Sequence, residues 1–198
     1  EAGVVAVKAD SPYKTIEELV AAAKEKGNLK ASTNGNKASN HTAAQLLAKS
    51  AGFKYKAIPY GGTADQLLAL RQGEVDFTCA KVADVAKLVK GDKPELRVLA
   101  VFNTKRDPEL PNVPTLGEKG LYPEWYGSAR ALVAPKGTKP EVIQYYVEAF
   151  KKTMQDPAVI EAHKKAGMAL DFKDNKELGD LIKAQDKFAR DVVNDLYK

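Results

Sequence analysis

Apolar positions in the first half of the chain follow two patterns that alternate along the sequence. Short apolar or alternating runs predict strands, and most are followed by segments with apolar residues three and four positions apart, which predict helices. Because strand and helix alternate, the sequence predicts an α/β fold with a mainly parallel sheet flanked by helices. The predicted strands are residues 4–7, 29–33, 55–59, 74–79 and 96–102, and the predicted helices are residues 16–26, 40–51, 63–72 and 82–90.

Local signals support several of these elements. Thr15 and Glu18 form the sequence of a capping box, and Thr63 with Gln66 is a second candidate. Residues 74–79 alternate, as expected for a half-buried strand. Residues 96–102 are almost continuously apolar, which indicates a strand buried on both faces of a sheet.

The pattern changes after residue 102. Prolines at positions 108, 111, 114 and 123 interrupt any long regular element. Residues 129–134 are apolar and predict one more strand. From Pro140 onward the spacing predicts three helices, residues 140–154, 157–166 and 176–197, whose apolar faces need a partner that the pattern does not identify.

A loop rich in Asn, Gly and Ser joins the second predicted strand to the second predicted helix. Asn34 and Gly35 favour a turn, and Ser39 or Asn40 is a suitable N-cap. The first N–H groups of a helix have no partner inside it, and the helix dipole favours negative charge there. The segment is therefore a candidate site for a carboxylate or phosphate. The alternative is an ordinary loop between a strand and a helix.

Two further features could bind an anion. The turn at Tyr60, Gly61 and Gly62 precedes a second helix, and its glycines would let a ligand approach the backbone. Arg130 begins an apolar run and could hold a carboxylate through two parallel hydrogen bonds. The alternative for Arg130 is a surface ion pair.

Composition narrows the possible functions. The 198 residues are 44% hydrophobic and 29% charged, which indicates a folded chain with one sizeable domain or two small lobes. The net charge of +5 comes from lysines spread among acids, so we expect a solvated surface and no nucleic-acid partner. No apolar run is long enough to span a membrane. The chain opens at Glu1 within an apolar run and without an initiator Met, so we expect that its beginning is missing.

Catalytic and metal-binding motifs are sparse. His41 and His163 are the two histidines and Cys79 is the single cysteine, so neither a metal site nor an intrachain disulfide is expected. Dinucleotide glycine motifs, phosphate-binding lysine loops and Gly-x-Ser-x-Gly do not occur, and no cofactor is expected. Asp65, Asp76 and Asp84 could act as an acid/base pair only if folding brought them together.

Several short motifs, in order and at similar spacing, resemble the tripartite tricarboxylate transporter substrate-binding proteins, the Bug receptors. The resemblance implies a type II periplasmic-binding-protein fold with two lobes, which binds a small organic acid without catalysis. It also implies a periplasmic location, a signal peptide on the precursor, and delivery of the ligand to membrane transporter subunits. The motifs are Ala31-Ser32 with the following loop and His41, then residues 58–62, 73–76, 99–101, 105–106, 111–115 and 134–138.

The resemblance also implies a division of the chain. Residues 8–124 would form a nearly complete second lobe. Residues 1–7 and 125–198 would be crossover strands and the C-terminal helices of a first lobe whose N-terminal part is absent. If that part is truly absent, the exposed apolar faces of the last helices favour self-association.

Ligand-binding residues are carried over from the resemblance by position. Two departures from the family pattern concern them: the loop before His41 is one residue longer, and Cys79-Ala80-Lys81 stands where many relatives have an acid or amide. Lys81 adds positive charge and, with Arg130, would favour a ligand with two or more carboxylates. The implied ligand residues are Ser32, Thr33, Asn34, Gly35, Ser39, Asn40, His41, Tyr60, Gly61 and Gly62.

Two other functions stay open at this point. A ligand-sensing co-receptor for a signalling partner would use the same closed state as a transport receptor. An α/β enzyme acting on a small anionic metabolite would need Asp76 or Cys79 in a catalytic role. The ligand itself could be a dicarboxylate, a tricarboxylate, an aromatic acid, an amino acid or a nicotinate-like acid.

Overall fold

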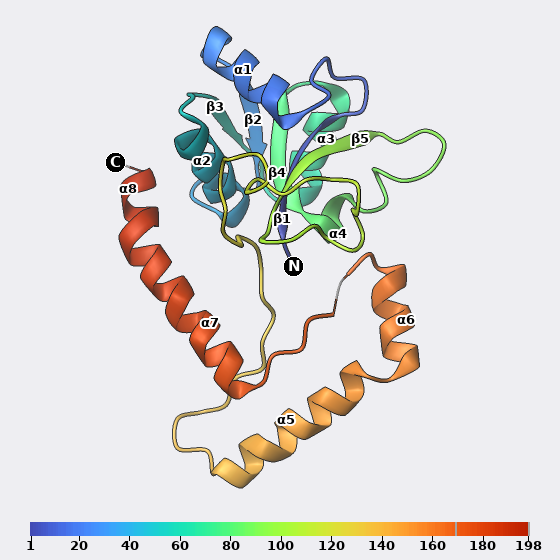
Figure 1. Cartoon of the computed structure of the whole chain (residues 1–198), viewed down its shortest axis with the longest axis vertical. Helices are drawn as coiled ribbons and strands as arrows, with labels where there is room; N and C mark the ends of the chain where they lie inside the picture. The colour runs from blue at the N-terminus through green and yellow to red at the C-terminus, as the bar shows by residue number, and fades with distance from the viewer. Residues whose placement is uncertain (169, 198) are drawn as a thin grey trace. The chain divides into compact units, whose positions relative to one another are not determined.

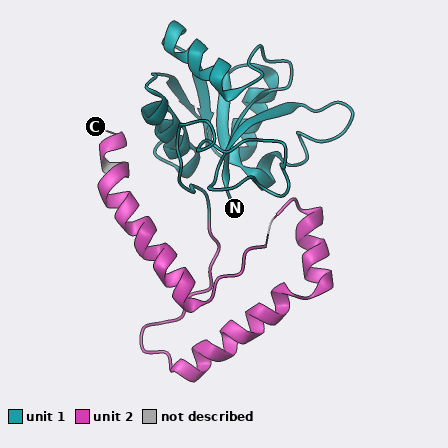
Figure 2. Ribbon diagram, in the orientation of Figure 1, with its two compact units in different colours: residues 1–128 teal, residues 129–198 magenta. Residues whose placement is uncertain are grey.

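The computed structural model describes residues 1–168 and 170–197 (Figure 1). Ala169 and Lys198 lie outside the described residues. The chain divides into two compact units, Glu1–Ser128 and Ala129–Lys198 (Figure 2). The first unit contains β1 (Gly3–Lys8), α1 (Ile16–Lys26), β2 (Lys30–Thr33), α2 (Ser39–Ala51), β3 (Lys56–Pro59), α3 (Thr63–Gln72), β4 (Phe77–Lys81), α4 (Val82–Val85) and β5 (Leu96–Phe102).

The first unit is built on a five-stranded sheet with the order β3-β2-β4-β1-β5. β2 pairs in parallel with β3 and with β4, whereas β1 pairs antiparallel with both β4 and β5. Four strands therefore share one direction, and β1 runs against them in the interior of the sheet. The α/β fold with a mainly parallel sheet is confirmed, with this reversed strand as an addition that the sequence pattern did not indicate.

Helices cover both faces of the sheet, and this explains why β1 is almost wholly apolar. Val4 and Ala6 belong to a core cluster that includes Leu67 and Leu70 of α3. Val5 and Val7 are also 0% exposed and, because strand residues alternate, they face the opposite side, where α1 and α2 lie (Figure 1). β4 is buried along its whole length and not half-buried as its alternation suggested.

The predicted N-cap is confirmed for one helix and wrong for two others. Thr15 and Glu18 form the expected capping box of α1. The N-cap of α2 is Ala38, which provides no side-chain cap. Instead, Oδ1 of Asn34 in the preceding loop accepts the main-chain N–H of Asn40. The N-cap of α3 is Gly62 without a side-chain cap, so the expected box with Gln66 does not form.

Two further elements differ from the sequence pattern. α4 spans one turn and ends at Val85, because the carbonyl of Leu88 accepts the N–H groups of Glu95 and Leu96 at the start of β5. Residues 129–134 are not a strand. A strand must pair with another strand, and no strand pairing among the described residues includes this exposed segment.

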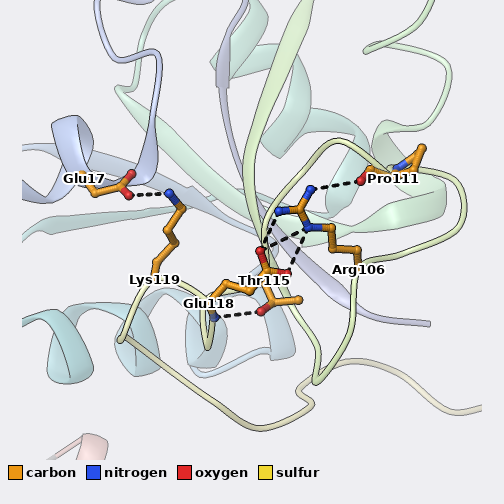
Figure 3. Close-up of polar contacts among 6 residues, drawn as sticks. All are labelled: Glu17, Arg106, Pro111, Thr115, Glu118 and Lys119. Carbon is orange, nitrogen blue, oxygen red and sulfur yellow. Dashed lines mark hydrogen bonds and ion pairs between the residues drawn. The ribbon is translucent and has the colours of Figure 1, made fainter.

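Polar contacts order the proline-rich segment after β5 and join it to α1 within the first unit (Figure 3). Arg106 donates to both carboxylate oxygens of Glu118, with a shortest contact of 2.7 Å, and to the carbonyl of Pro111 at 3.4 Å. The main-chain N–H of Glu118 donates to Thr115 Oγ1. Lys119 forms an ion pair of 2.7 Å with Glu17 on α1.

The second unit is helical, as expected from residue 140 onward. Its elements are α5 (Pro140–Met154), α6 (Pro157–Lys165), α7 (Asn175–Phe188), the π-helical segment η1 (Ala189–Val193) and α8 (Asn194–Leu196). The last three follow one another without a break, so the predicted helix 176–197 is one helical run with a π-helical turn. Neither α5, α6 nor α7 contains a buried residue.

Candidate functional site

The candidate site lies at the edge of the sheet where β2 and β4 end. These strands are parallel, so their carboxyl ends share one edge. α2 follows β2 after a short loop, and α3 begins soon after β3. Ligands of open α/β sheets bind at such an edge, beyond the carboxyl ends of the strands.

The loop between β2 and α2 is held by its own polar groups. Thr33 Oγ1 lies 3.3 Å from the carbonyl of Gly35, and Asn34 Oδ1 lies 3.3 Å from the N–H of Asn40. Lys37 has a positive φ of 58°, and its N–H donates to Nδ1 of His41 at 2.9 Å. The first intrahelical bond runs from Thr42 N–H to Ala38 O, so the helix itself does not use the N–H groups of its first residues.

A buried polar network joins this helix start to α3 and to two strands. Gln66, on α3, is 0% exposed, and its Nε2 donates to the carbonyl of Cys79 at 2.7 Å. The same amide contacts Thr78 Oγ1 on β4 and the carbonyl of Ser32 on β2. Ser32 Oγ donates to Thr78 Oγ1 at 3.0 Å. Buried polar groups of this kind are stable only when hydrogen-bonded, and here they bond one another.

Asn40 and Lys81 extend the network toward the first turn of α2. Asn40 Nδ2 donates to Gln66 Oε1 at 2.9 Å, which links the first turns of two helices that lie on opposite faces of the sheet. Lys81 Nζ donates to Asn40 Oδ1 at 2.6 Å and lies 3.5 Å from Ser39 Oγ. The hydroxyl of Tyr126 donates to the carbonyl of Ser39 at 3.1 Å.

Burial shifts the pKa of three groups in this region. It lowers the pKa of Lys81, against smaller opposing effects of Asp84, Cys79 and Glu1. It also lowers the pKa of His41 from its ordinary value of 6.5, so the imidazole is neutral at neutral pH. Burial raises the pKa of the Cys79 thiol to about 12, which keeps it protonated and unsuited to nucleophilic attack.

The turn before α3 lies next to β2. Tyr60 N–H donates to the carbonyl of Thr33 at 2.9 Å, and the Tyr60 hydroxyl donates to Glu74 at 3.0 Å. Gly62 is extended, with φ 178°, and a Cβ built on it would meet no described atom within 4 Å. The backbone of Gly62 is therefore accessible to a ligand.

The structure brings most of the proposed ligand residues together in the first unit. Arg130 is exposed and belongs to the second unit, so its role in binding stays a prediction. Sequence reasoning missed Gln66 and Thr78 as parts of the site. The available signal was Gln66 itself, an amide between the apolar residues of α3. Among the described residues, no group of three or more His, Cys, Asp or Glu could hold a metal ion.

Comparison with known proteins agrees with this architecture. The fold is that of the periplasmic-binding-protein-like receptors of type II. The chain belongs to the tripartite tricarboxylate transporter family of receptors, whose family model matches residues 1–196. A "UPF0065 protein in gbd 5'region" of Cupriavidus necator is 38% identical over 152 residues, which are 76% of this chain and 45% of that protein. Protein BugT of Bordetella pertussis is 29% identical over 150 residues, 75% of this chain and 45% of that protein.

Solved structures resemble the chain over most of its length. A TctC solute binding protein from Polaromonas, solved without ligand, has a TM-score of 0.86 at 27% identity. The match covers 98% of this chain and 66% of the Polaromonas chain. The R. palustris protein Rpa4515, solved with adipate, shares the fold with a TM-score of 0.77 at 22% identity; the match covers 96% of this chain and 64% of that one.

The chain spans about half the length of the curated relatives it matches, from 45% to 55% of the first three. Among the described residues, no helix is both long and apolar enough to cross a membrane.

Proposed function

We propose that the chain is part of an extracytoplasmic solute receptor, which binds a small carboxylate in the periplasm and delivers it to a membrane transporter. The observation that carries this proposal is the bond of 2.9 Å between Asn40 and Gln66. It places the starts of α2 and α3 together at the carboxyl end of the sheet. Helix starts attract anions, and Lys81 adds an ammonium beside one of them.

Relatives support a carboxylate as the ligand class. The family is described as a transporter family receptor, and the R. palustris neighbour was solved with adipate. Adipate is a dicarboxylate, and carboxylates are the anions that exposed helix N–H groups and an ammonium bind well. The transporter subunit that would receive the ligand is inferred from the family description alone.

We infer that residues 8–124 form the second lobe and that residues 1–7 and 125–198 connect to and complete a first lobe. The exposed apolar residues of α5, among them Tyr145 at 70% and Phe150 at 42%, are surfaces that a further layer would cover. Closure of the two lobes would then bury the ligand.

Residues that an enzyme would need have structural roles instead. Asp76 Oδ2 accepts the main-chain N–H of Lys30 at 2.7 Å, and Asp84 Oδ2 accepts that of Lys81 at 3.0 Å. The Cys79 thiol is fully buried. These placements support binding without catalysis, and turnover of a metabolite that depended on Asp76 or Cys79 would contradict it.

The test is native mass spectrometry of the purified protein, followed by a thermal-shift panel of small acids. We expect a bound acid or a rise in melting temperature with one class of carboxylate. No bound acid and no shift with any acid would contradict the proposal. Capture of a signalling protein from membranes, without transporter subunits, would favour the sensing role instead.

A substitution at Gly62 locates the binding. Gly62→Val adds a side chain where the protein leaves open space and the backbone is extended, so the ligand should be blocked while the free energy of unfolding falls by only about 1 kcal/mol, the cost of a poorer N-cap. Gly179→Val on α7 is the matched control, since a Cβ there also meets nothing within 4 Å. Loss of the ligand-induced shift in both variants, or in neither, would contradict a site at the start of α3.

A further inference from the structure

A groove lined in part by lysines lies at the opposite end of α2 from the candidate site. It has a volume of about 440 Å³ and opens to solvent. α1 and α2 both end beside it, and β2 and β3 begin soon after these two helices. At about 1.5 Å per residue, the 13 residues of α2 place the groove roughly 20 Å from the first turn of that helix. The groove is therefore separate from the candidate carboxylate site.

The buried residues that line the groove are apolar. Ala23, Ala48 and Phe53 are 0%, 5% and 8% exposed and form its floor. Gly27 and Gly52 end the two helices in left-handed backbone, and a Cβ built on either would meet nothing within 4 Å. An apolar side chain of another molecule would therefore reach the floor without displacing a side chain.

Three exposed lysines, Lys24, Lys49 and Lys54, surround this apolar floor. Among the described residues, none of the three forms an ion pair or a side-chain hydrogen bond. Glu25 follows Lys24 but does not line the groove, because adjacent residues of a helix point in different directions. Residues 24–30 and 49–56 together contain six lysines and one acid. Positive charge is thus concentrated at this end of the sheet.

The two helix ends offset only part of this charge. The C-terminal end of a helix carries roughly half a negative charge, which favours lysines in the last turn such as Lys24 and Lys49. Two such ends together offset roughly one of the three positive charges. Lys54 follows the C-cap of α2 and lies outside the helix. A surplus of positive charge therefore remains around the groove, and an anionic group placed among the lysines would reduce their mutual repulsion.

We propose that this groove is a docking site for an acidic segment of a partner protein. An apolar side chain of the segment would contact Phe53, and the carboxylates on either side of it would face the three lysines. Charge complementarity of this kind guides association and excludes basic partners. A flat bilayer surface fits less well, since its headgroups would meet the lysines and leave the hollow apolar floor uncovered. The inference goes beyond the proposed function and does not rest on it.

The test measures the fluorescence anisotropy of a labelled peptide, Glu-Glu-Leu-Glu-Glu, titrated with the whole chain. We expect saturable binding that added salt weakens. The uncharged peptide Gln-Gln-Leu-Gln-Gln should bind about 10-fold more weakly or not at all. Glu-Glu-Ser-Glu-Glu keeps the charge and loses the apolar side chain, so it should also bind more weakly than the Leu peptide.

Substitution of the three lysines locates the peptide. The combined variant Lys24→Gln, Lys49→Gln and Lys54→Gln should bind Glu-Glu-Leu-Glu-Glu about 10-fold more weakly, the effect of three exposed ion pairs. Its stability should change little, because the three side chains are exposed and have no partner among the described residues. If the combined variant does not fold, Lys54→Gln alone takes its place.

A matched control removes the same net charge elsewhere in the first unit. It combines Lys87→Gln, Lys93→Gln and Lys105→Gln, at three exposed lysines that also form no ion pair among the described residues. Peptide affinity should change by less than about twofold in this control, because screening weakens the influence of distant charges. Lys105→Gln alone is the control for Lys54→Gln.

Each contrary outcome overturns the inference in a recognisable way. Equal weakening in the groove variant and in its control would show that net charge alone attracts the peptide. Equal binding of the Leu and Ser peptides would remove the apolar floor from the site. Phosphatidylglycerol vesicles that bind in a lysine-dependent manner, without any peptide binding, would assign the groove to a membrane surface. Failure of the wild-type chain to bind the acidic peptide would overturn the docking site and leave the carboxylate receptor unaffected.

Discussion

Both units contain amphipathic helices, but they bury them very differently. α2 has nine buried residues, whereas α5, α6 and α7 have none. Local signals do not explain this difference, because α7 has a complete capping box between Asp174 and Glu177 and α5 has Pro140 in its first turn. The helices of the second unit are thus as well specified locally as those of the first.

The difference teaches that caps and apolar spacing make a helix but do not make a core. In the first unit a sheet lies beneath the helices, and strands β1, β4 and β5 contribute residues that are fully buried. Burial of an apolar side chain stabilises by about 1.5–3 kcal/mol, and this gain requires a second layer. The following predictions test the contrast between the units, from the largest expected effect to the smallest.

Removal of an aromatic ring should give the largest difference in stability loss between the two units. Phe77 is 0% exposed and lies 6.3 Å from Phe53 and 5.6 Å from Tyr55, measured between ring centroids. Phe77→Ala should lower the free energy of unfolding by about 3–5 kcal/mol. Phe150→Ala, at a residue 42% exposed on α5, should change it by less than about 0.5 kcal/mol.

The measurement is chemical denaturation followed by far-ultraviolet circular dichroism, with the fluorescence of Trp125 as a probe of the first unit. Trp125 packs against the core cluster of that unit and is the single tryptophan of the chain. Equal losses from the two substitutions would show that Phe150 is packed as tightly as Phe77, and the contrast would fail.

Loss of a buried amide should have the next largest effect. Gln66→Leu leaves Asn40 Nδ2 and the carbonyl of Cys79 without their bonds, which should cost about 1–3 kcal/mol of stability. Gln144→Leu is the control, since Gln144 is exposed on α5 and bonds Glu148 at 3.0 Å. Urea denaturation of both variants measures the difference. If Gln66→Leu left the free energy of unfolding unchanged, the network would not hold the helix starts together.

Acid should destabilise the protein through His41. Its pKa is lowered from 6.5 by burial, so the unfolded state takes up a proton more readily than the folded state. Stability is therefore present above pH 6.5 and falls as the pH drops through the folded pKa. His41→Gln should flatten the decrease in melting temperature below that pH, and His163→Gln on α6 is the control. An identical acid profile for wild type and His41→Gln would contradict this prediction.

The smallest effect is expected for the ion pair between Arg106 and Glu118 (Figure 3). The Arg106 guanidinium lowers the pKa of Glu118 below its ordinary value of 4.5, so the pair stabilises above that pH and its effect is lost as the pH falls. Glu118→Gln should lower the melting temperature slightly at neutral pH, and added salt should remove the difference. The control is Glu161→Gln, which breaks the looser pair with Lys165 at 3.7 Å on α6. A salt-independent loss in Glu118→Gln would point to packing and not to charge.

Predictions from the sequence succeeded where residues close in the chain decide the outcome. The capping box at Thr15, the strand 96–102 and the helix 140–154 appear with the expected bounds. They failed where a distant group supplies the partner. Asn34 took the capping role from Ser39 and Asn40, and the start of β5 ended α4 after one turn.

The candidate site shows the same contrast between features set by neighbouring residues and features set by distant ones. Its loop and glycines were visible in the sequence, because turns and helix starts have characteristic residues. The bond from Asn40 to Gln66 joins residues 26 positions apart, and the bond from Lys81 to Asn40 joins residues 41 positions apart. No local pattern specifies such pairs.

The sequence by itself determined most of the helices and strands and marked the helix starts as candidate anion sites, since these features follow from side-chain periodicity, capping and backbone preference. The tertiary structure alone decided the reversed direction of β1, the burial of Gln66 and the placement of Lys81. The physical reason is that these depend on which strands pair and which layers meet, and hydrogen bonds and burial between distant segments exist only once the sheet has formed.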